Sequence, residues 1–221
     1  MEKLRAIRHE HGAFDGRFYE RHPDFAAITR AASTFADHAD WPEPEDYARA
    51  FAGEGPVRFA RAPVKRRRPA GPVVRADLYD AQIVQQRAVP TRARMWHDYL
   101  NALVWATYPR AKLALHRRQH AAIEKWIPEG AHALPNARTR EMDALALVDE
   151  GGVLVMGEHT FLFGHALFES LVVGQPAMVA RSVILEPAPS PSTTVADALL
   201  AARLDDTRHF LSPDELPRRH L

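Results

Sequence analysis

The chain has 221 residues, enough for one sizeable domain with a buried core, and its 46% hydrophobic and 26% charged residues are ordinary for a globular protein. The formal net charge of +1 gives no global reason to expect a nucleic acid or a membrane surface as partner. The absence of cysteine excludes disulfides, iron–sulfur clusters and thiolate zinc sites. Because the N-terminus is charged and no long apolar run follows, we expect a cytoplasmic protein that makes no membrane contact.

The N-terminal part of the chain predicts a helical layer. Apolar residues recur at helical spacing over residues 13–38, where Pro23 starts or interrupts a helix. Pro42 and Pro44 then open a second short helix, and the acidic residues at its start suit the helix dipole. Residues 57–61 could form a short strand.

A basic, proline-rich loop follows this layer. Between Arg58 and Arg75 there are seven basic side chains and no acidic one. Such a run can bind phosphate groups, and the candidate anion-binding residues are Lys65, Arg66, Arg67, Arg68 and Arg140, the last from a later loop. The alternative is a solvated loop balanced by acidic residues elsewhere, since aromatic residues for base stacking are almost absent.

Two consecutive helices are predicted to form the centre of the fold. Residues 77–88 read as a short helix or an extended entry segment, and Thr91 is the predicted N-cap of the first central helix. Almost every residue in 95–108 is apolar or small, as in a helix that is buried on all sides. Pro109 ends this helix, because the residue before a proline avoids helical geometry, and the second helix covers residues 110–126.

The C-terminal half predicts a small sheet. Residues 144–148 and 153–156 are two short apolar runs joined by a segment with two glycines, a pattern typical of a hairpin. Residues 161–173 indicate a buried turn that leads into a helix, and 177–185 is a third strand candidate. The expected fold is α+β and mainly helical, with a buried central helix pair and a small sheet of about three strands.

One globular domain is expected over residues 1–186. It would consist of the N-terminal helical layer with the basic loop, residues 1–75, and a core, residues 76–186. Prolines then mark a linker, and a short amphipathic helix over 194–204 and a polar tail complete residues 187–221.

The first candidate site lies inside the apolar central helix, where His97, Asp98 and Asn101 interrupt the apolar pattern. Buried polar groups cost free energy unless they find partners, so these residues indicate a polar site in the interior. His97 could act as a general base with Asn101 beside it, and Asp98 could ligate a metal ion. The alternative is a structural network that ties this helix to its neighbours.

The second candidate is His116 and His120 on the next helix, four residues apart. Two such imidazoles can bind one divalent ion side by side, with a third ligand such as Asp98 or Glu169. The two arginines between them favour the alternative of an exposed, cation-rich helix face.

The third candidate is His165 with Glu169, one helical turn later and flanked by phenylalanines. A carboxylate beside an imidazole in apolar surroundings can orient a base or complete a set of metal ligands. It can equally be an ion pair that serves only packing. Asp143, Asp149 and Glu150, at the ends of the predicted hairpin strands, could add carboxylates, although the last two are also ordinary turn residues.

Three blocks of residues carry a resemblance to a known family. They are Trp96-His97-Asp98 through Asn101-Ala-Leu-Val-Trp105 with Tyr108-Pro109-Arg110-x-Lys112, then Arg140-x-x-Asp143-Ala-Leu-x-Leu-x-Asp149-Glu150-x-Gly152, then Leu162-Phe163-Gly164-His165-Ala166-Leu167-x-Glu169. In this order they resemble a bacterial, mainly proteobacterial, family catalogued as domain of unknown function three-zero-two-five, over roughly residues 76–186. The resemblance implies no activity, but it implies that the His97 and His165 groups belong to one fold, which favours a shared pocket.

Two functional hypotheses follow. The first is a hydrolase or nuclease-like enzyme that uses a divalent metal ion, with Asp98, His165 and Glu169 as ligands and His97, Asn101 and His165 in catalysis. The nuclease variant rests on a second similarity, between Asn101-Ala-Leu-Val-Trp105-Ala-Thr107 and the asparagine-containing half of histidine–asparagine–histidine nucleases. The other hypothesis is a non-catalytic binding protein, with a structural polar core and a basic loop for a small or anionic partner such as a nucleic acid.

Overall fold

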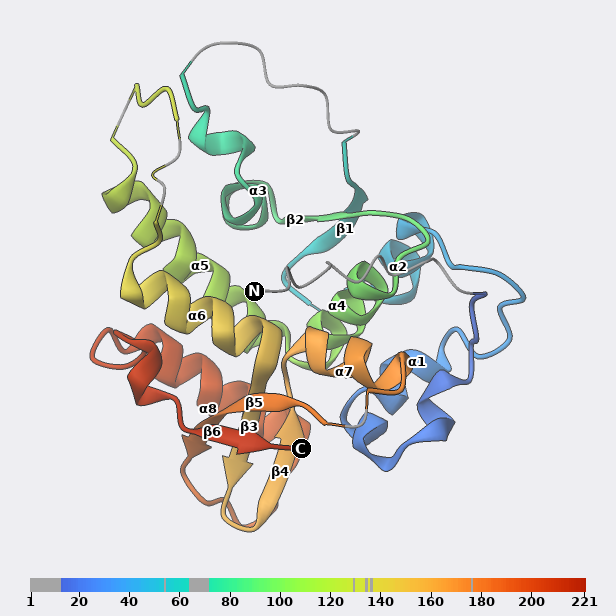
Figure 1. Ribbon diagram of the computed structural model, residues 1–221. Coiled ribbons are helices and arrows are strands. Elements are labelled where there is room, and N and C mark those ends of the chain that lie inside the picture. Colours follow the sequence, from blue (N-terminus) through green and yellow to red (C-terminus); the bar gives the residue numbers. More distant parts are fainter. Residues whose placement is uncertain are drawn as a thin grey trace, which may run out of the picture.

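The computed structural model describes residues 13–53, 55–63, 72–128, 130–133, 135, 137–175 and 177–221. Within these residues it contains eight α-helices, a two-stranded sheet and a four-stranded sheet. The α+β class and the predominance of helix are therefore confirmed. Figure 1 shows α6 (Arg140–Gly151) and α8 (Thr193–Asp205) beside the four-stranded sheet, with α5 (Pro109–Trp126) packed on these two helices. The N-terminal helix α1 lies on the other side of α7 (His165–Val172) from the sheet.

The N-terminal layer consists of several short helices packed on aromatic side chains. The 3₁₀ helices η1 and η2 and the helices α1 and α2 cover Phe18–Arg21, Pro23–Ala27, Thr29–Ser33 and Pro44–Ala50. The sequence pattern of 13–38 thus gives three short pieces, because Pro23 cannot donate a backbone hydrogen bond and His22 before it is extended, with φ −148° and ψ 136°. The acidic start predicted for α2 is confirmed by a reciprocal cap between Glu43 and Asp46.

A small parallel sheet joins this layer to the centre. It pairs β1 (Arg58–Arg61) with β2 (Ala88–Thr91), and α3 (Tyr79–Gln86), preceded by the 3₁₀ helix η3 (Arg75–Asp77), connects the two strands. The predicted N-cap role of Thr91 is wrong. Thr91 is the last residue of β2, paired with Arg61, and its hydroxyl donates to the Val89 carbonyl at 3.0 Å. Pairing with β1 keeps this segment extended, and the chain turns towards the next helix only at Arg94, with φ 58°.

The predicted central helix pair is α4 (Trp96–Thr107) and α5 (Pro109–Trp126). Every residue from 98 to 105 is buried, which confirms the prediction from the uniformly apolar pattern. Pro109 separates the two helices and is the first residue of α5, where the missing backbone N–H costs nothing. Aromatic rings of the N-terminal layer surround Tyr99 of α4.

The C-terminal half contains α6 (Arg140–Gly151), β3 (Gly152–Met156), β4 (His159–Leu162), α7 (His165–Val172), β5 (Val179–Leu185), α8 (Thr193–Asp205), η4 (Pro213–Glu215) and β6 (Arg218–His220). The four-stranded sheet has the order β4-β3-β5-β6. Strand β3 is antiparallel to β4 and parallel to β5, so α7 lies in the crossover between two parallel strands. The last strand, β6, is antiparallel to β5.

The strand predicted over residues 144–148 is wrong, because this segment belongs to α6. The Thr139 hydroxyl caps the helix by accepting a backbone N–H in its first turn. Ala144, Leu145 and Val148 are fully buried at helical spacing, whereas the residues between them are only partly buried. The hairpin is instead β3–β4 and turns at Gly157, whose φ is 60°.

The C-terminal segment packs on the rest of the molecule. Helix α8 lies along α5, and its buried Asp197 accepts the backbone N–H groups of Arg110 and Ala111 at 3.3 and 2.8 Å. A carboxylate at a helix N-terminus stabilises it by satisfying donors that lack intrahelical partners. In the part of the chain that the structure describes, no helix is both long enough and apolar enough to cross a membrane.

Candidate metal centre

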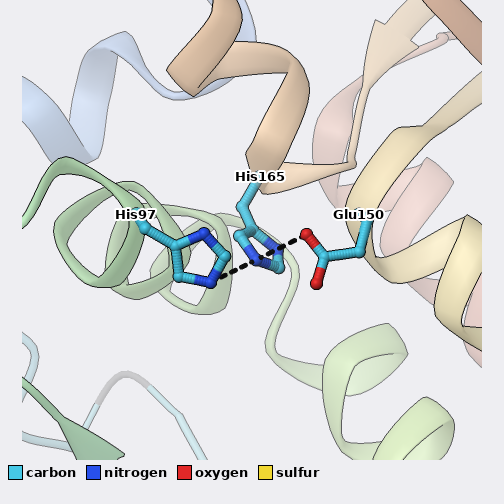
Figure 2. Close-up of side chains that lie close together, drawn as sticks. All are labelled: His97, Glu150 and His165. Carbon is cyan, nitrogen blue, oxygen red and sulfur yellow. Dashed lines mark hydrogen bonds and ion pairs between the residues drawn. The ribbon is translucent and has the colours of Figure 1, made fainter. Parts of the chain in front are cut away.

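Three side chains from three helices meet beside α4 (Figure 2). His97 lies in the first turn of α4, His165 is the first residue of α7, and Glu150 lies in the last turn of α6. The two imidazoles face each other with their Nε2 atoms 3.2 Å apart, and the Glu150 Oε2 atom lies 3.2 Å from His165 Nε2. One ligand atom from each residue lies within 4.8 Å of the others, close enough for a single ion to contact all three.

The Nδ1 atom of each imidazole has a hydrogen-bond partner outside the group of three residues. His97 Nδ1 lies 3.2 Å from a Glu169 carboxylate oxygen, and His165 Nδ1 lies 3.0 Å from the Asp149 carbonyl oxygen. A carbonyl only accepts, so His165 Nδ1 carries the proton and its Nε2 keeps a lone pair directed at the group. This carbonyl is one of those that the C-terminal end of α6 leaves without a helical partner. Carboxylate or carbonyl partners of this kind orient histidine ligands in metal sites.

Burial and charge determine the protonation of the two histidines. The His165 side chain is 3% exposed, and burial lowers its pKa to about 3, so the ring is neutral at neutral pH. The hydrogen bond to Glu169 raises the pKa of His97. A proton on His97 Nε2 can therefore be donated to His165 Nε2. A divalent cation between the two nitrogens would take the place of that proton.

The group is reachable from solvent on one side. The His97 and Glu150 side chains are 33% and 51% exposed, in contrast to His165. His97 also lines a cleft of about 470 Å³ between α3, β2 and α4, together with Tyr79, Gln82, Arg92, Asp98 and Asn101. A molecule in this cleft would contact the edge of the group at His97.

The other residues predicted for the His97 site have partners of their own. Asp98 receives the Arg92 guanidinium through Nε and Nη2 at 3.0 and 2.6 Å, and also the Arg92 backbone N–H at 2.6 Å. It is not among the three residues that could hold an ion. Asn101 lines the cleft and donates from Nδ2 to the Tyr79 hydroxyl at 3.1 Å. Glu169, predicted as a ligand, lies behind His97 rather than between the imidazoles.

The second histidine pair does not form a site with a third ligand in the described part of the chain. His116 Nδ1 lies 2.8 Å from an Asp80 carboxylate oxygen. His120 Nε2 lies 3.3 Å from the Gln85 side-chain amide and 3.5 Å from a Glu124 carboxylate oxygen. Both imidazoles are buried, so the exposed, cation-rich face suggested by the neighbouring arginines is also not what the structure shows.

The candidate anion-binding residues are only partly within the described residues. Lys65, Arg66, Arg67 and Arg68 lie outside them. Arg140 is exposed and pairs with Asp214, and it donates to the Ser212 hydroxyl at 2.6 Å.

Three residues of this centre carried weak or no signal in the sequence. The sequence predicts Glu150 only as an extra carboxylate at a hairpin, because residues 144–148 resemble a strand. Lys112 is completely buried on α5 and forms an ion pair with Asp149. Helical spacing predicts neither the burial of Lys112 nor its pairing with Asp149. All three positions nevertheless fall within the residue blocks that carry the family resemblance.

Comparison with known proteins confirms that resemblance over part of the chain. Residues 70–162 match the model of a family described as Protein of unknown function (DUF3025). This segment runs to the end of β4, so it contains His97 and Glu150 and ends shortly before His165. No curated protein and no solved structure matches the chain.

Proposed function

We propose that this protein is a hydrolase that uses a divalent metal ion held by His97, His165 and Glu150. The observation that carries the proposal is the paired orientation of the imidazoles. Each has its Nδ1 engaged by an outer partner and its Nε2 directed at the other, with the Glu150 carboxylate beside them.

The distances suit a tetrahedral ion such as zinc. Zinc–nitrogen bonds of about 2.0–2.1 Å at a tetrahedral angle place two nitrogen ligands about 3.3 Å apart. The two Nε2 atoms are 3.2 Å apart. Two imidazoles and one carboxylate are also a ligand set that zinc accepts in catalytic sites, where a water molecule takes the fourth position. In such sites the ion lowers the pKa of the bound water to about 7, which supplies a nucleophile for hydrolysis at neutral pH.

The neighbouring cleft supports a role beyond structure. A purely structural zinc ion has four protein ligands, whereas among the described residues this group offers three and is open to solvent at His97 and Glu150. The cleft beside His97 offers hydrogen-bonding side chains from Tyr79, Gln82 and Asn101 to a substrate. In this proposal His97 is a ligand and Glu169 orients its imidazole. Asp98 binds no metal and instead holds the Arg92 side chain in the wall of the cleft.

The test is zinc binding by the metal-stripped, untagged chain, measured by competition with a chromophoric chelator. Two variants, His97→Gln and Glu150→Gln, should lose the site. Matched controls are His159→Gln and Glu158→Gln, an imidazole and a carboxylate that are exposed at the β3–β4 turn. We expect one zinc ion per parent chain, binding lost in the first two variants and retained in the controls. A parent chain that binds no zinc, cobalt or manganese would overturn the proposal.

Hydrolysis is tested on the same five proteins with phosphodiester, carboxylic ester and peptide reporter substrates. We expect the zinc-loaded parent and both controls to cleave one class and the two site variants to be inactive.

A non-catalytic binding protein is the second candidate. It is favoured by the way other buried polar groups are paired within the chain, Asp98 with Arg92, Asn101 with Tyr79 and His116 with Asp80. Zinc bound at one equivalent without cleavage of any reporter class would favour this candidate over the hydrolase.

A further inference from the structure

Lys112 is the least expected side chain near the metal centre. It lies on α5, its residue is 0% exposed, and its ammonium pairs with Asp149 on α6 and lies 5.5 Å from the centre of the Trp105 ring. A buried ammonium is costly to desolvate unless it is paired, and a buried ion pair often stabilises a fold no better than apolar residues of similar size. Fold stability alone therefore does not explain why the chain has a buried ion pair at this position.

The pair fixes the turn of α6 that serves the metal centre. Asp149, the partner of Lys112, is also the residue whose carbonyl accepts the Nδ1–H of His165 at 3.0 Å. The next residue in the chain is Glu150, whose carboxylate lies 3.2 Å from His165 Nε2. A rotation of this turn would displace both the Asp149 carbonyl beside His165 Nδ1 and the Glu150 carboxylate beside His165 Nε2.

Close backbone packing couples the same turn to α7. A Cβ atom at Gly164 would lie 2.4 Å from the Glu150 carbonyl oxygen and 2.5 Å from the Gly151 and Gly152 nitrogens. The N–H of Gly164 donates to the Gly152 carbonyl at 2.9 Å. Since only glycine permits this approach, the first residue of α7, His165, is placed directly against the end of α6.

We propose that Lys112 is a positioning residue of the metal centre. Its ion pair with Asp149 holds the last turn of α6 in the orientation in which the Asp149 carbonyl orients His165 and Glu150 faces the same imidazole. This inference rests on the proposed metal site, and it assigns the α5 helix, which supplies no ligand in that site, a part in assembling it.

The test uses Co²⁺ as probe, because its visible absorption reports ligand geometry as well as binding. The main variant is Lys112→Met combined with Asp149→Asn, which removes both charges and leaves no unpaired buried ion. The second is Asp149→Asn alone, which keeps the size of the side chain and an acceptor for Lys112. The control is Glu141→Gln, which neutralises the carboxylate of another α5–α6 ion pair, that with Arg118 at 2.8 Å.

We expect the double variant to bind Co²⁺ roughly 10–100-fold more weakly than the parent and with a changed visible spectrum, as for other outer-shell substitutions. Asp149→Asn should show a smaller shift in the same direction. Glu141→Gln should change the melting temperature and leave both affinity and spectrum at the parent values.

Parental affinity and spectrum in the double variant would overturn the positioning role while leaving the metal site intact. If the double variant does not fold, the same outcome in Asp149→Asn overturns it. A parent chain that binds no Co²⁺ overturns the proposed function itself, and the role of Lys112 with it.

Discussion

Two histidine pairs of this protein differ in how their members are brought together. His116 and His120 are one helical turn apart on α5, yet each imidazole contacts a different partner. His97 and His165 are 68 residues apart in the sequence, and their Nε2 atoms face each other at 3.2 Å. Neighbouring positions on a helix face therefore do not suffice for a site, because other helices supply competing partners.

The orientation of each imidazole accounts for the difference. His116 has its Nδ1 beside Asp80, as His97 has beside Glu169, but its ring is stacked on Trp105 with an interplanar angle of 7°. This stacking leaves its Nε2 facing no polar partner among the described residues. Near His97 the corresponding space holds a second imidazole and a carboxylate. Substitutions in the two pairs and their partners test this difference.

The largest effect is expected from His165→Gln. Removal of a ligand should weaken zinc binding by more than about 100-fold, since loss of an outer partner alone costs up to that much. His120→Gln, the matched substitution in the other pair, should leave zinc affinity unchanged. Competition with a chromophoric chelator measures both. An equal loss of zinc affinity in the two variants would show that the His116–His120 pair contributes to zinc binding as much as the His97–His165 pair does.

Glu169→Ala should weaken zinc binding by roughly 10–100-fold, because the Nδ1 of His97 loses the carboxylate that orients it. Glu169→Gln keeps an acceptor for that nitrogen and should lose less. Isothermal titration of the metal-stripped proteins distinguishes the two. Equal affinities in both variants and the parent would contradict the orienting role.

Asp80→Ala tests whether the His116–His120 pair stabilises the fold rather than binding metal. It leaves the buried His116 Nδ1–H without its acceptor and should lower the free energy of unfolding by about 1–3 kcal/mol, with zinc affinity unchanged. Urea unfolding measures the loss, and Asp80→Asn, which retains an acceptor, is the control. A fall in zinc affinity without a fall in stability would reverse the assignment.

The smallest effect is expected from Glu124→Gln. Its carboxylate is half exposed and lies 3.5 Å from His120 Nε2, so the change in unfolding free energy should stay within about 0.5 kcal/mol. The same urea titration measures it. A larger loss would show that the His120 contact is a stabilising pair.

Local patterns in the sequence were sufficient for several elements. The helices at residues 44–50, 109–126 and 193–205 and the strand at 179–185 were predicted close to their observed bounds, whereas the helix at 96–107 begins four residues later than the predicted N-cap at Thr91 implies. Apolar periodicity, prolines and acidic first turns act over a few residues, so they are visible without the fold. The same kind of pattern failed at 144–148, where an alternation of alanine and leucine suits a strand and a helix equally.

The polar residues of the buried helices are visible in the amino-acid pattern alone, since His97 and Asp98 lie within an apolar run and His165 lies among phenylalanines. The packing of distant segments, in contrast, places Glu150 rather than Asp98 beside the two imidazoles. Asp98 is held by Arg92 at the end of β2, whereas the last turn of α6 is pressed against Gly164 at the start of α7. Contacts between distant segments depend on how whole helices pack, and no short-range pattern encodes that packing.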